Sequence, residues 1–231
     1  MIPRILEPEV MNTPEEAIGY DNMSHQAVNA RFVDDLFMAA ENFGLPGFLS
    51  ETSPSQRILD IGTGTAQIPV EFCRRGGNAI IVAIDLAEEM LKVARQNVEA
   101  ADCSERIELK LVDSKQLPDA DNSFDVVISN SIVHHIPEPQ TAIAEMLRVL
   151  KPGGLLFVRD LLRPDSTEEL DSLVSTYAKD ENPQQQRMFA ESLHAALTLP
   201  ELHEILNNLN CPRTWATQTT DRHWTMEGVM S

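Results

Sequence analysis

The stretch Arg57 to Ala66, RILDIGTGTA, decides the fold of this chain. Its apolar first half carries an acid, Asp60, near its end, and a glycine-rich turn follows. Residues 67–75 then read as a helix. A strand, a glycine turn and a helix in that order form the opening half of a nucleotide-binding βαβ unit. Because glycine has no Cβ, the backbone can turn sharply there and a ligand can lie directly against the main chain.

The spacing of the small residues indicates which ligand this turn binds. A dinucleotide fingerprint requires G-x-G-x-x-G, and Gly62 and Gly64 fit it, but Gln67 occupies the third position. The chain instead has acid-x-G-x-G-x-small, with Asp60 at the start and Ala66 at the end. This pattern resembles the first motif of class I S-adenosylmethionine (SAM) dependent methyltransferases, which usually have a third glycine where Ala66 stands. A tight strand–helix turn without a ligand is the alternative.

The next strand and its carboxyl end fit the same family. Residues 79–84, AIIVAI, are typical of a parallel strand buried on both faces. Asp85 follows this strand, and its distance along the chain from the glycine turn is close to the ~20-residue spacing at which an acid binds a ribose in nucleotide folds. The segment resembles the family's second motif, which implies that Asp85 holds the ribose hydroxyls and that Leu86 and Met90 flank the adenine. Asp85 also has the sequence position of a helix N-cap, a role that is compatible with ribose binding.

Two further strand ends resemble the third and fourth motifs of the family. One strand ends at Asp113 and Ser114, and the resemblance implies that the carboxylate accepts from the adenine amine while the next backbone N–H donates to the ring. An ordinary polar loop is the alternative there. The strand at 124–129 runs into 130–137, NSIVHHIP, where Asn130 is expected to meet the methionine tail of SAM. The carboxyl ends of parallel strands line one crevice, so these positions should converge.

Alternating strands and helices over residues 57–162 imply a parallel sheet with right-handed crossovers. The resemblance implies an α/β, doubly wound, mostly parallel seven-stranded sheet with helices on both faces, a Rossmann-like methyltransferase fold. We expect an N-terminal helical cap over 1–50 and a SAM-binding domain over 51–231, with a C-terminal helical insertion and a terminal hairpin. Residues 151–154 are expected to close a helix before a fifth strand at 155–160.

Composition limits the partners and the compartment. The three cysteines, Cys73, Cys103 and Cys211, have no paired spacing, which predicts a reduced, cytoplasmic location and neither a disulfide scaffold nor a metal site. The net charge of −18 disfavours nucleic acid and anionic membrane surfaces. No run approaches the ~18 apolar residues of a membrane span. Residues 1–10, MIPRILEPEV, lack a signal-peptide apolar region, and residues 2–13 read as a loosely held arm. The sequence leaves the oligomeric state open.

The chemistry of methyl transfer explains why the catalytic group is harder to find than the cofactor site. Displacement at a sulfonium methyl releases a neutral leaving group, so the protein mainly aligns the reactants in a dry pocket. A hydroxyl or ammonium acceptor also needs a base. We expect His135, ahead of His134, to be that base or to position the acceptor, although both could instead cap the loop or line the methionine tail. The residues that could contact the acceptor, each with packing or ion pairing as its alternative, are Tyr20, Arg159, His194 and His223.

The sequence thus predicts a SAM-dependent methyltransferase that acts on a small molecule and releases S-adenosyl-L-homocysteine (SAH). A NAD-type oxidoreductase is disfavoured by the missing third glycine and by the segments 113–114 and 130–137. A SAM-binding protein without methyl transfer, or a different SAM-derived transfer on the same fold, stays open. Arsenic methylation needs several thiols around the acceptor, and the positions of Cys73 and Cys103 disfavour it.

Overall fold

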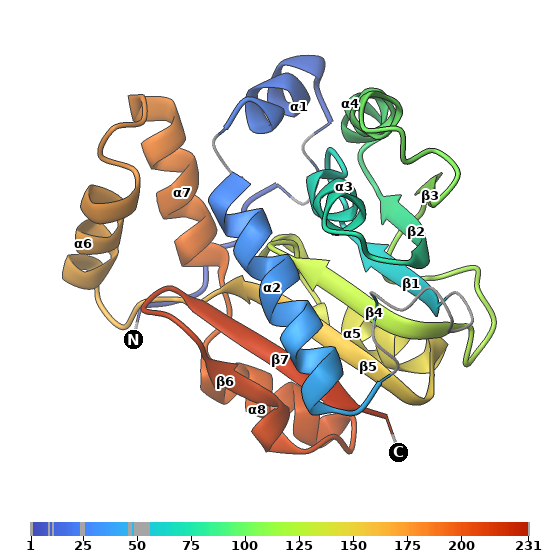
Figure 1. Ribbon diagram of the computed structural model, residues 1–231. Coiled ribbons are helices and arrows are strands. Elements are labelled where there is room, and N and C mark those ends of the chain that lie inside the picture. The colour runs from blue at the N-terminus through green and yellow to red at the C-terminus, as the bar shows by residue number, and fades with distance from the viewer. Residues whose placement is uncertain are drawn as a thin grey trace. The chain divides into compact units, whose positions relative to one another are not determined.

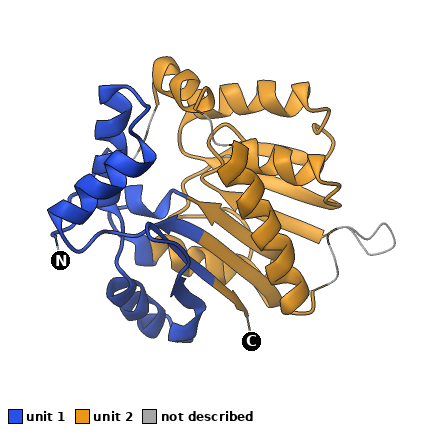
Figure 2. Ribbon diagram, turned by 60° about the vertical axis from the view of Figure 1, so that its left-hand side comes forward, with its two compact units in different colours: residues 1–9, 131–140, 159–226 blue, residues 10–130, 141–158, 227–231 orange. Residues whose placement is uncertain are grey.

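The computed structural model describes residues 2–8, 10, 12–23, 26–45, 48 and 56–230. The chain forms two compact units, each assembled from separate stretches (Figure 2). Unit 1 comprises residues 1–9, 131–140 and 159–226, and unit 2 comprises 10–130, 141–158 and 227–231. These units differ from the expected domains, so the expected boundary at residue 50 stays a prediction.

The strands form a seven-stranded sheet in the order β3-β2-β1-β4-β5-β7-β6 (Figure 1). β1 pairs in parallel with β2 and β4, β2 pairs in parallel with β3, and β6 and β7 are antiparallel. This confirms the predicted mostly parallel sheet, and the antiparallel pair lies where a terminal hairpin was expected. The strands are β1 Gln56–Ile61, β2 Ala79–Asp85, β3 Ile107–Leu111, β4 Phe124–Asn130, β5 Leu150–Leu161, β6 Ala216–Gln218 and β7 His223–Val229.

Helices alternate with the strands from β1 to β3 and again from β4 to β5, whereas β3 and β4 follow each other without a helix between them. Capping boxes fix the starts of three helices. None of the helices in the described ranges is both long and apolar enough to cross a membrane. The α-helices are α1 Pro14–Asp21, α2 Gln26–Asn42, α3 Gln67–Arg74, α4 Glu88–Ala100, α5 Pro139–Val149, α6 Thr167–Tyr177, α7 Pro183–Ala195 and α8 Leu199–Asn208. Two 3-10 turns complete the described elements, η1 Val133–His135 and η2 Arg213–Trp215.

The core of unit 2 places α2, α3 and α4 against one face of the central strands. Ile58 of β1 and Ile81 of β2 belong to the same buried cluster as Phe32 and Phe157. The rings of Phe32 and Phe157 meet edge to face with centroids 5.1 Å apart, a contact of about 0.5–1.5 kcal/mol beyond its area burial. Figure 1 shows α5 behind the sheet and α2 in front of it. This packing holds the carboxyl ends of β1 and β2 in fixed register.

The start of β5 differs from the sequence prediction. The strand begins at Leu150, so residues 151–154 lie within it and do not form a closing turn. The reason is pairing with the end of the chain: the Gly153 N–H donates to Met230 O at 2.8 Å, and the Met230 N–H donates to Gly154 O at 3.0 Å. Gly153 is left-handed, with φ of 78°. A Cβ on Gly154 would lie 2.8 Å from the carbonyl oxygen of Asp125.

Residues 2–8 are held in unit 1, so the expectation of a loose arm is wrong for this part of the chain. The Arg4 guanidinium donates to the carbonyls of His134 at 3.2 Å and Ile136 at 3.0 Å, and to that of Ala195 at 2.7 Å. Beneath α6 and α7, a small apolar core of unit 1 also includes Ile2 at its edge. The N-terminal segment therefore bridges the η1 turn and the end of α7.

Candidate active site

The turn after β1 exposes its backbone by adopting left-handed conformations. Gly62, Gly64 and Ala66 have φ of 71°, 54° and 60°. The N–H groups of Gly62 and Thr63 both donate to Ile84 O at 2.9 Å, which fixes the turn to β2. An alanine in this conformation costs roughly 1–2 kcal/mol. The turn therefore keeps its glycine-like shape at Ala66 in spite of the side chain.

Asp85 ties the end of β2 to this turn. Its Oδ2 accepts from the Gly64 N–H and its Oδ1 from the Ala87 N–H, both at 2.8 Å. Burial raises the pKa of the Asp85 carboxyl, and these backbone hydrogen bonds oppose the rise. The N-cap residue of α4 is Ala87, so Asp85 is not the helix N-cap. A carboxylate held in this way presents fixed acceptor lone pairs beside the glycine turn.

Asp60 lies beneath the turn as a buried and only partly satisfied acid. The residue is 2% exposed. Its Oδ2 and the Thr65 Oγ1 have no hydrogen-bond partner within the described part of the chain. Burial raises the pKa of Asp60 to about 7, and the charge of Asp85 adds to the rise. Buried polar groups are normally paired, so these atoms fit a ligand that brings hydrogen-bond donors or positive charge.

Tyr20, expected to contact the acceptor, lies against the glycine turn. A Cβ built on Gly64 would be 3.6 Å from Tyr20 Cε1. Tyr20 also packs against a small buried cluster that includes Met90. Burial raises the pKa of Tyr20 to about 12, with contributions from Asp85 and Asp60, so the phenol stays neutral. Within unit 2, Tyr20 thus belongs with the residues expected to hold the cofactor.

The residues expected to read the adenine, Asp113 and Ser114, come two and three positions after the end of β3. The Val112 N–H donates to Asp85 O at 3.0 Å, which places this strand end beside the previous one. The Asp113 carboxylate accepts from the Lys115 backbone N–H at 2.9 Å. Although burial opposes it, this bond and the Lys115 ammonium lower the pKa of Asp113. Ser114 is buried. Asp113 is thus an ionised acceptor at neutral pH.

The end of β4 lies on the other side of β1 from β2 and belongs to the same row of strand carboxyl ends. Ser129 stands opposite Ile61 in the parallel register and donates from Oγ to Ile61 O at 2.9 Å. Asn130 is the last residue of the strand. The strand order reverses between β1 and β4, and ligands bind at such switch points. Leu86, on the other flank, is 39% exposed and offers an apolar surface at the end of β2.

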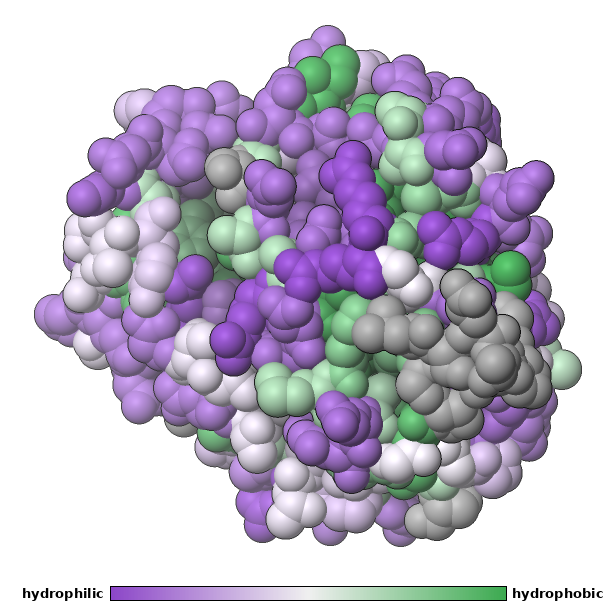
Figure 3. Space-filling view, viewed as in Figure 1, coloured by the Kyte–Doolittle hydropathy of each residue, from purple (hydrophilic) through white to green (hydrophobic). Residues whose placement is uncertain are grey.

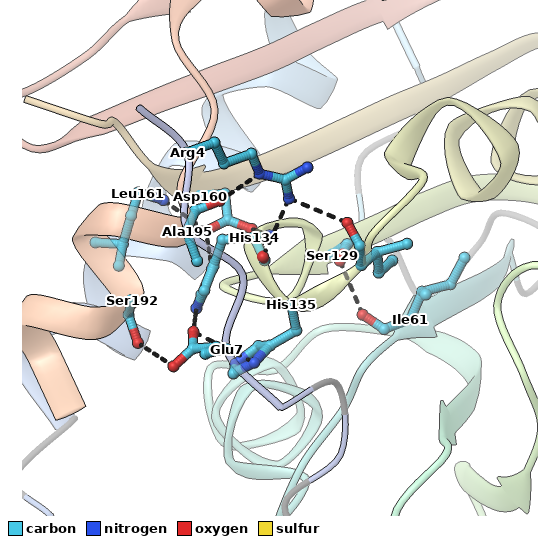
Figure 4. Close-up of polar contacts among 11 residues, drawn as sticks. Arg4, Glu7, Ile61, Ser129, His134, His135, Asp160, Leu161, Ser192 and Ala195 are labelled. Atoms are coloured by element: carbon cyan, nitrogen blue, oxygen red, sulfur yellow. Dashed lines mark hydrogen bonds and ion pairs between the residues drawn. The ribbon is translucent and has the colours of Figure 1, made fainter. Parts of the chain in front are cut away.

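The two candidate catalytic histidines lie in η1, in unit 1 (Figure 4). His134 is buried, and its Nδ1 lies 2.5 Å from Asp160 Oδ1. Burial lowers the pKa of His134, but the Asp160 carboxylate outweighs it and the net shift is upward. Burial and then the neighbouring His134 lower the pKa of His135 to about 4. His135 is therefore neutral at pH 7 and a weak base.

The comparisons with known proteins agree with this geometry. Residues 59–158 match the family model described as a methyltransferase domain. The matched stretch contains Asp60, the glycine turn, Asp85 and Asp113. Residues 59–158 thus form a methyltransferase domain, and the fold is that of the class I SAM-dependent enzymes. SAM is the cofactor of this class, and the acids and the open backbone of the turn fit its adenosine and its charged tail.

Curated relatives and a solved structure extend the match. A ubiquinone/menaquinone biosynthesis C-methyltransferase, UbiE, from Ruegeria sp. (strain TM1040) is 36% identical over 124 residues, 53% of this chain and 50% of the relative. An arsenite methyltransferase from Halobacterium salinarum is 31% identical over 169 residues, 71% of this chain and 43% of the relative. The chain thus spans about half the length, or less, of these relatives. A SAM-dependent methyltransferase from Aquifex aeolicus shares the fold, with a TM-score of 0.65 and 19% identity over 95% of this chain and 99% of that one.

Sequence reasoning missed one polar network of the methyltransferase domain. Gln67 Nε2 and Asn97 Nδ2 both donate to Asp21 Oδ1, at 2.9 and 2.8 Å. Asn97 also donates to Thr65 O at 3.0 Å, and Asn29 donates to Gln67 Oε1 at 2.9 Å. The only signal in the sequence was Gln67 in the third fingerprint position. A pocket of about 440 Å³ opens beside this network between α2, α3 and α4, and none of the acids at the strand ends line it.

The other predicted acceptor contacts lie in unit 1. Arg159 Nε donates to Thr225 Oγ1 at 3.0 Å. His223 Nδ1 lies 2.9 Å from Thr220 Oγ1, and burial followed by nearby arginines lowers its pKa to about 4. His194 Nδ1 is buried and has no hydrogen-bond partner among the described residues. Tyr20 belongs to unit 2, whereas Arg159, His194 and His223 belong to unit 1. An acceptor site of the methyltransferase that is formed by all four residues therefore stays a prediction.

Proposed function

We propose that this protein transfers a methyl group from SAM to a small-molecule acceptor. The observation that carries the proposal is the set of acids at adjacent strand ends around an open glycine turn. Asp60 is buried with an unpaired oxygen, Asp85 is fixed by two backbone N–H groups, and Asp113 is ionised. This combination suits a ligand with a cationic tail, a ribose and an amine-bearing base.

The cofactor contacts follow from these positions. Asp85 accepts from the ribose hydroxyls, Asp113 and the Ser114 N–H read the adenine edge, and Leu86 and Met90 flank the ring. These assignments rest on the ends of β2 and β3, which lie next to each other. When bound, SAM supplies an electrophilic methyl group on a sulfonium. The residues of this chain bind and orient the cofactor.

The methionine portion lies on the glycine turn in this proposal. Asp60 and the backbone of Gly62, Thr63 and Gly64 hold the charged tail, and Asn130 contacts it from the end of β4. The unpaired Asp60 Oδ2 supports this assignment, because the tail carries an ammonium group. Tyr20, packed against Gly64, shields the same turn from water.

The acceptor is a small molecule, and the protein acts in the cytoplasm. The net charge of −18 supports this choice over a nucleic acid, and Figure 3 shows a face covered mostly by hydrophilic residues. The Ruegeria relative, a biosynthetic C-methyltransferase, supports a small acceptor as well. His135, with a pKa of about 4, positions the acceptor as a neutral hydrogen-bond partner rather than as a strong base. His134, Arg159, His194 and His223 are the further candidates for acceptor contact or catalysis.

The test is transfer of label from SAM with a tritiated methyl group to a fractionated cell extract. We expect label in the small-molecule fraction, lost with Asp85→Asn and kept with the exposed Glu88→Gln control. If the label were instead attached to macromolecules and released by nuclease or protease treatment, the proposed small-molecule acceptor would be wrong. SAH binding without transfer to any fraction would support a SAM-binding protein instead of an enzyme.

A further inference from the structure

Three side chains of unit 1 bring together one carboxylate and two imidazole rings, groups of the kind that bind metal ions. Glu7 comes from the N-terminal segment, and His134 and His135 come from η1. One carboxylate oxygen and one nitrogen of each ring all lie within 4.8 Å of one another. Figure 4 shows the Glu7 carboxylate facing both imidazole rings. The sequence could not show this cluster, because Glu7 lies far along the chain from the histidines.

The distances within the cluster suit coordination better than hydrogen bonding. Glu7 Oε1 lies 3.4 Å from His134 Nε2 and 3.4 Å from His135 Nδ1. Hydrogen bonds between nitrogen and oxygen are about 2.7–3.2 Å long. Ligands held about 2.0–2.1 Å from a tetrahedral zinc ion lie roughly 3.3 Å apart. Two of the three separations therefore already have the length of a tetrahedral edge.

Two of these atoms lack other partners. Glu7 Oε1 and His135 Nδ1 are buried and have no hydrogen-bond partner in the described part of the chain. The side chains of Glu7 and His134 are only 12% and 4% exposed. Buried polar atoms are rarely left unpaired. The two unpaired atoms face each other, so a cation between them would satisfy both.

The outer contacts hold the three side chains in the orientation that binding needs. The His134 Nδ1–H donates to Asp160 Oδ1 at 2.5 Å, which directs Nε2 toward Glu7. Ser192 Oγ donates to the second Glu7 oxygen at 3.3 Å. A hydrogen bond with the Pro8 backbone raises the pKa of the His135 ring, against the stronger lowering effect of burial. Metal-binding histidines are commonly oriented by a carboxylate or a backbone carbonyl in this way.

We propose that Glu7, His134 and His135 bind a divalent transition-metal ion of the zinc type. Two imidazoles and a carboxylate are a known zinc ligand set, and three protein ligands leave a fourth position for water or another oxygen ligand. The ion joins residues 2–8 to the η1 turn within unit 1. The prediction of no metal site rested on cysteine spacing, and this ligand set contains no cysteine. In the loaded protein His135 binds the ion through Nδ1, so it does not accept a proton, and the acceptor contact proposed for it above belongs to the metal-free protein.

The experiment uses the full chain without a polyhistidine tag, dialysed against a chelator and then against metal-free buffer. Calorimetric titration with Zn²⁺ should show one equivalent bound, and Co²⁺ should give the intense visible absorption of a four-coordinate site. Mg²⁺ should not bind, because it prefers all-oxygen, octahedral sites. Zn²⁺ should also raise the melting temperature. The absence of stoichiometric Zn²⁺ and Co²⁺ binding would overturn the proposal.

Two variants locate the site. Glu7→Gln and His135→Asn should each weaken Zn²⁺ binding by at least about 100-fold, more than the loss of an outer-shell partner. The matched control is His203→Asn: His203 is a histidine of α8 whose Nε2 lies 3.2 Å from Ala216 O, outside the cluster. It should bind zinc like the wild type. Melting in chelator reports whether each variant is folded. Equal affinity in both cluster variants and the wild type would contradict the assignment, as would loss of binding in the His203 control.

Discussion

The substitution Asp85→Asn tests the proposal that this carboxylate binds the ribose of the cofactor. The carboxylate accepts two backbone N–H bonds at 2.8 Å, from Gly64 and Ala87. Hydrogen bonds to charged groups contribute about 1.5–3 kcal/mol each. An amide keeps one acceptor oxygen but places an NH₂ group where the second acceptor was. In the proposed complex the carboxylate also accepts from the ribose hydroxyls, and the amide would replace one of these acceptors by a donor, so we expect SAH binding to lose roughly 3 kcal/mol, which corresponds to about a 100-fold higher Kd.

Titration calorimetry with SAH measures this loss directly, and thermal melting shows whether the variant is folded. Glu88→Gln is the matched control, because Glu88 is an exposed acid in the first turn of the same helix. It should bind SAH like the wild type. An Asp85→Asn protein that is folded and binds SAH within threefold of the wild type would refute the ribose assignment.

Three other predictions follow from the same structure. Because burial raises the pKa of Asp60 to about 7 in the folded protein, against an ordinary value of about 3.8 when unfolded, the folded state holds the extra proton between pH 4 and 7. The stability of the wild type relative to Asp60→Asn should therefore fall by up to roughly 4 kcal/mol as the pH rises through that window, and urea unfolding measures it. SAM affinity should rise from pH 6 to 8, as measured by calorimetry. A stability difference between the two proteins that does not change with pH would contradict the burial argument. Tyr20→Ala should lose about 2–3 kcal/mol of stability and weaken SAH binding about tenfold. Tyr20→Phe keeps the ring and should have smaller effects in both assays. Equal effects of the two substitutions would contradict a packing role for the ring. Gly154→Ala should destabilise the fold by about 2–3 kcal/mol, because the new Cβ would lie 2.8 Å from a backbone oxygen. Gly153→Ala should cost only about 1 kcal/mol, because its Cβ meets open space and the cost comes from φ of 78°. The reverse order of the two losses in urea unfolding would contradict the β5 geometry.

The parts of the site that sequence could predict are those fixed by local chain order. The glycine turn follows β1, Asp85 ends β2 and Asp113 comes two residues after β3. Parallel strands bring their carboxyl ends to one edge. The sheet and its order of elements were predictable for the same reason. The start of β5 was not, because it depends on pairing between Gly153 and Met230 at the far end of the chain.

Residues brought in from distant segments carried no signal of their own. Tyr20 lies on the glycine turn because α1 packs on α4, and nothing near it in sequence indicates that contact. Glu7 reaches η1 because Arg4 binds the carbonyls of that turn. The burial of the His134 side chain and the lowered pKa of the neighbouring His135 also depend on this tertiary packing.

The central claim is that the turn after β1 and the acids around it bind an adenosyl sulfonium cofactor rather than a dinucleotide. Calorimetric titration of the wild-type chain with SAH and, separately, with NAD⁺ tests it most directly. We predict one equivalent of SAH bound and no measurable heat from NAD⁺. Binding of NAD⁺, or no binding of SAH by a folded protein, would contradict the account.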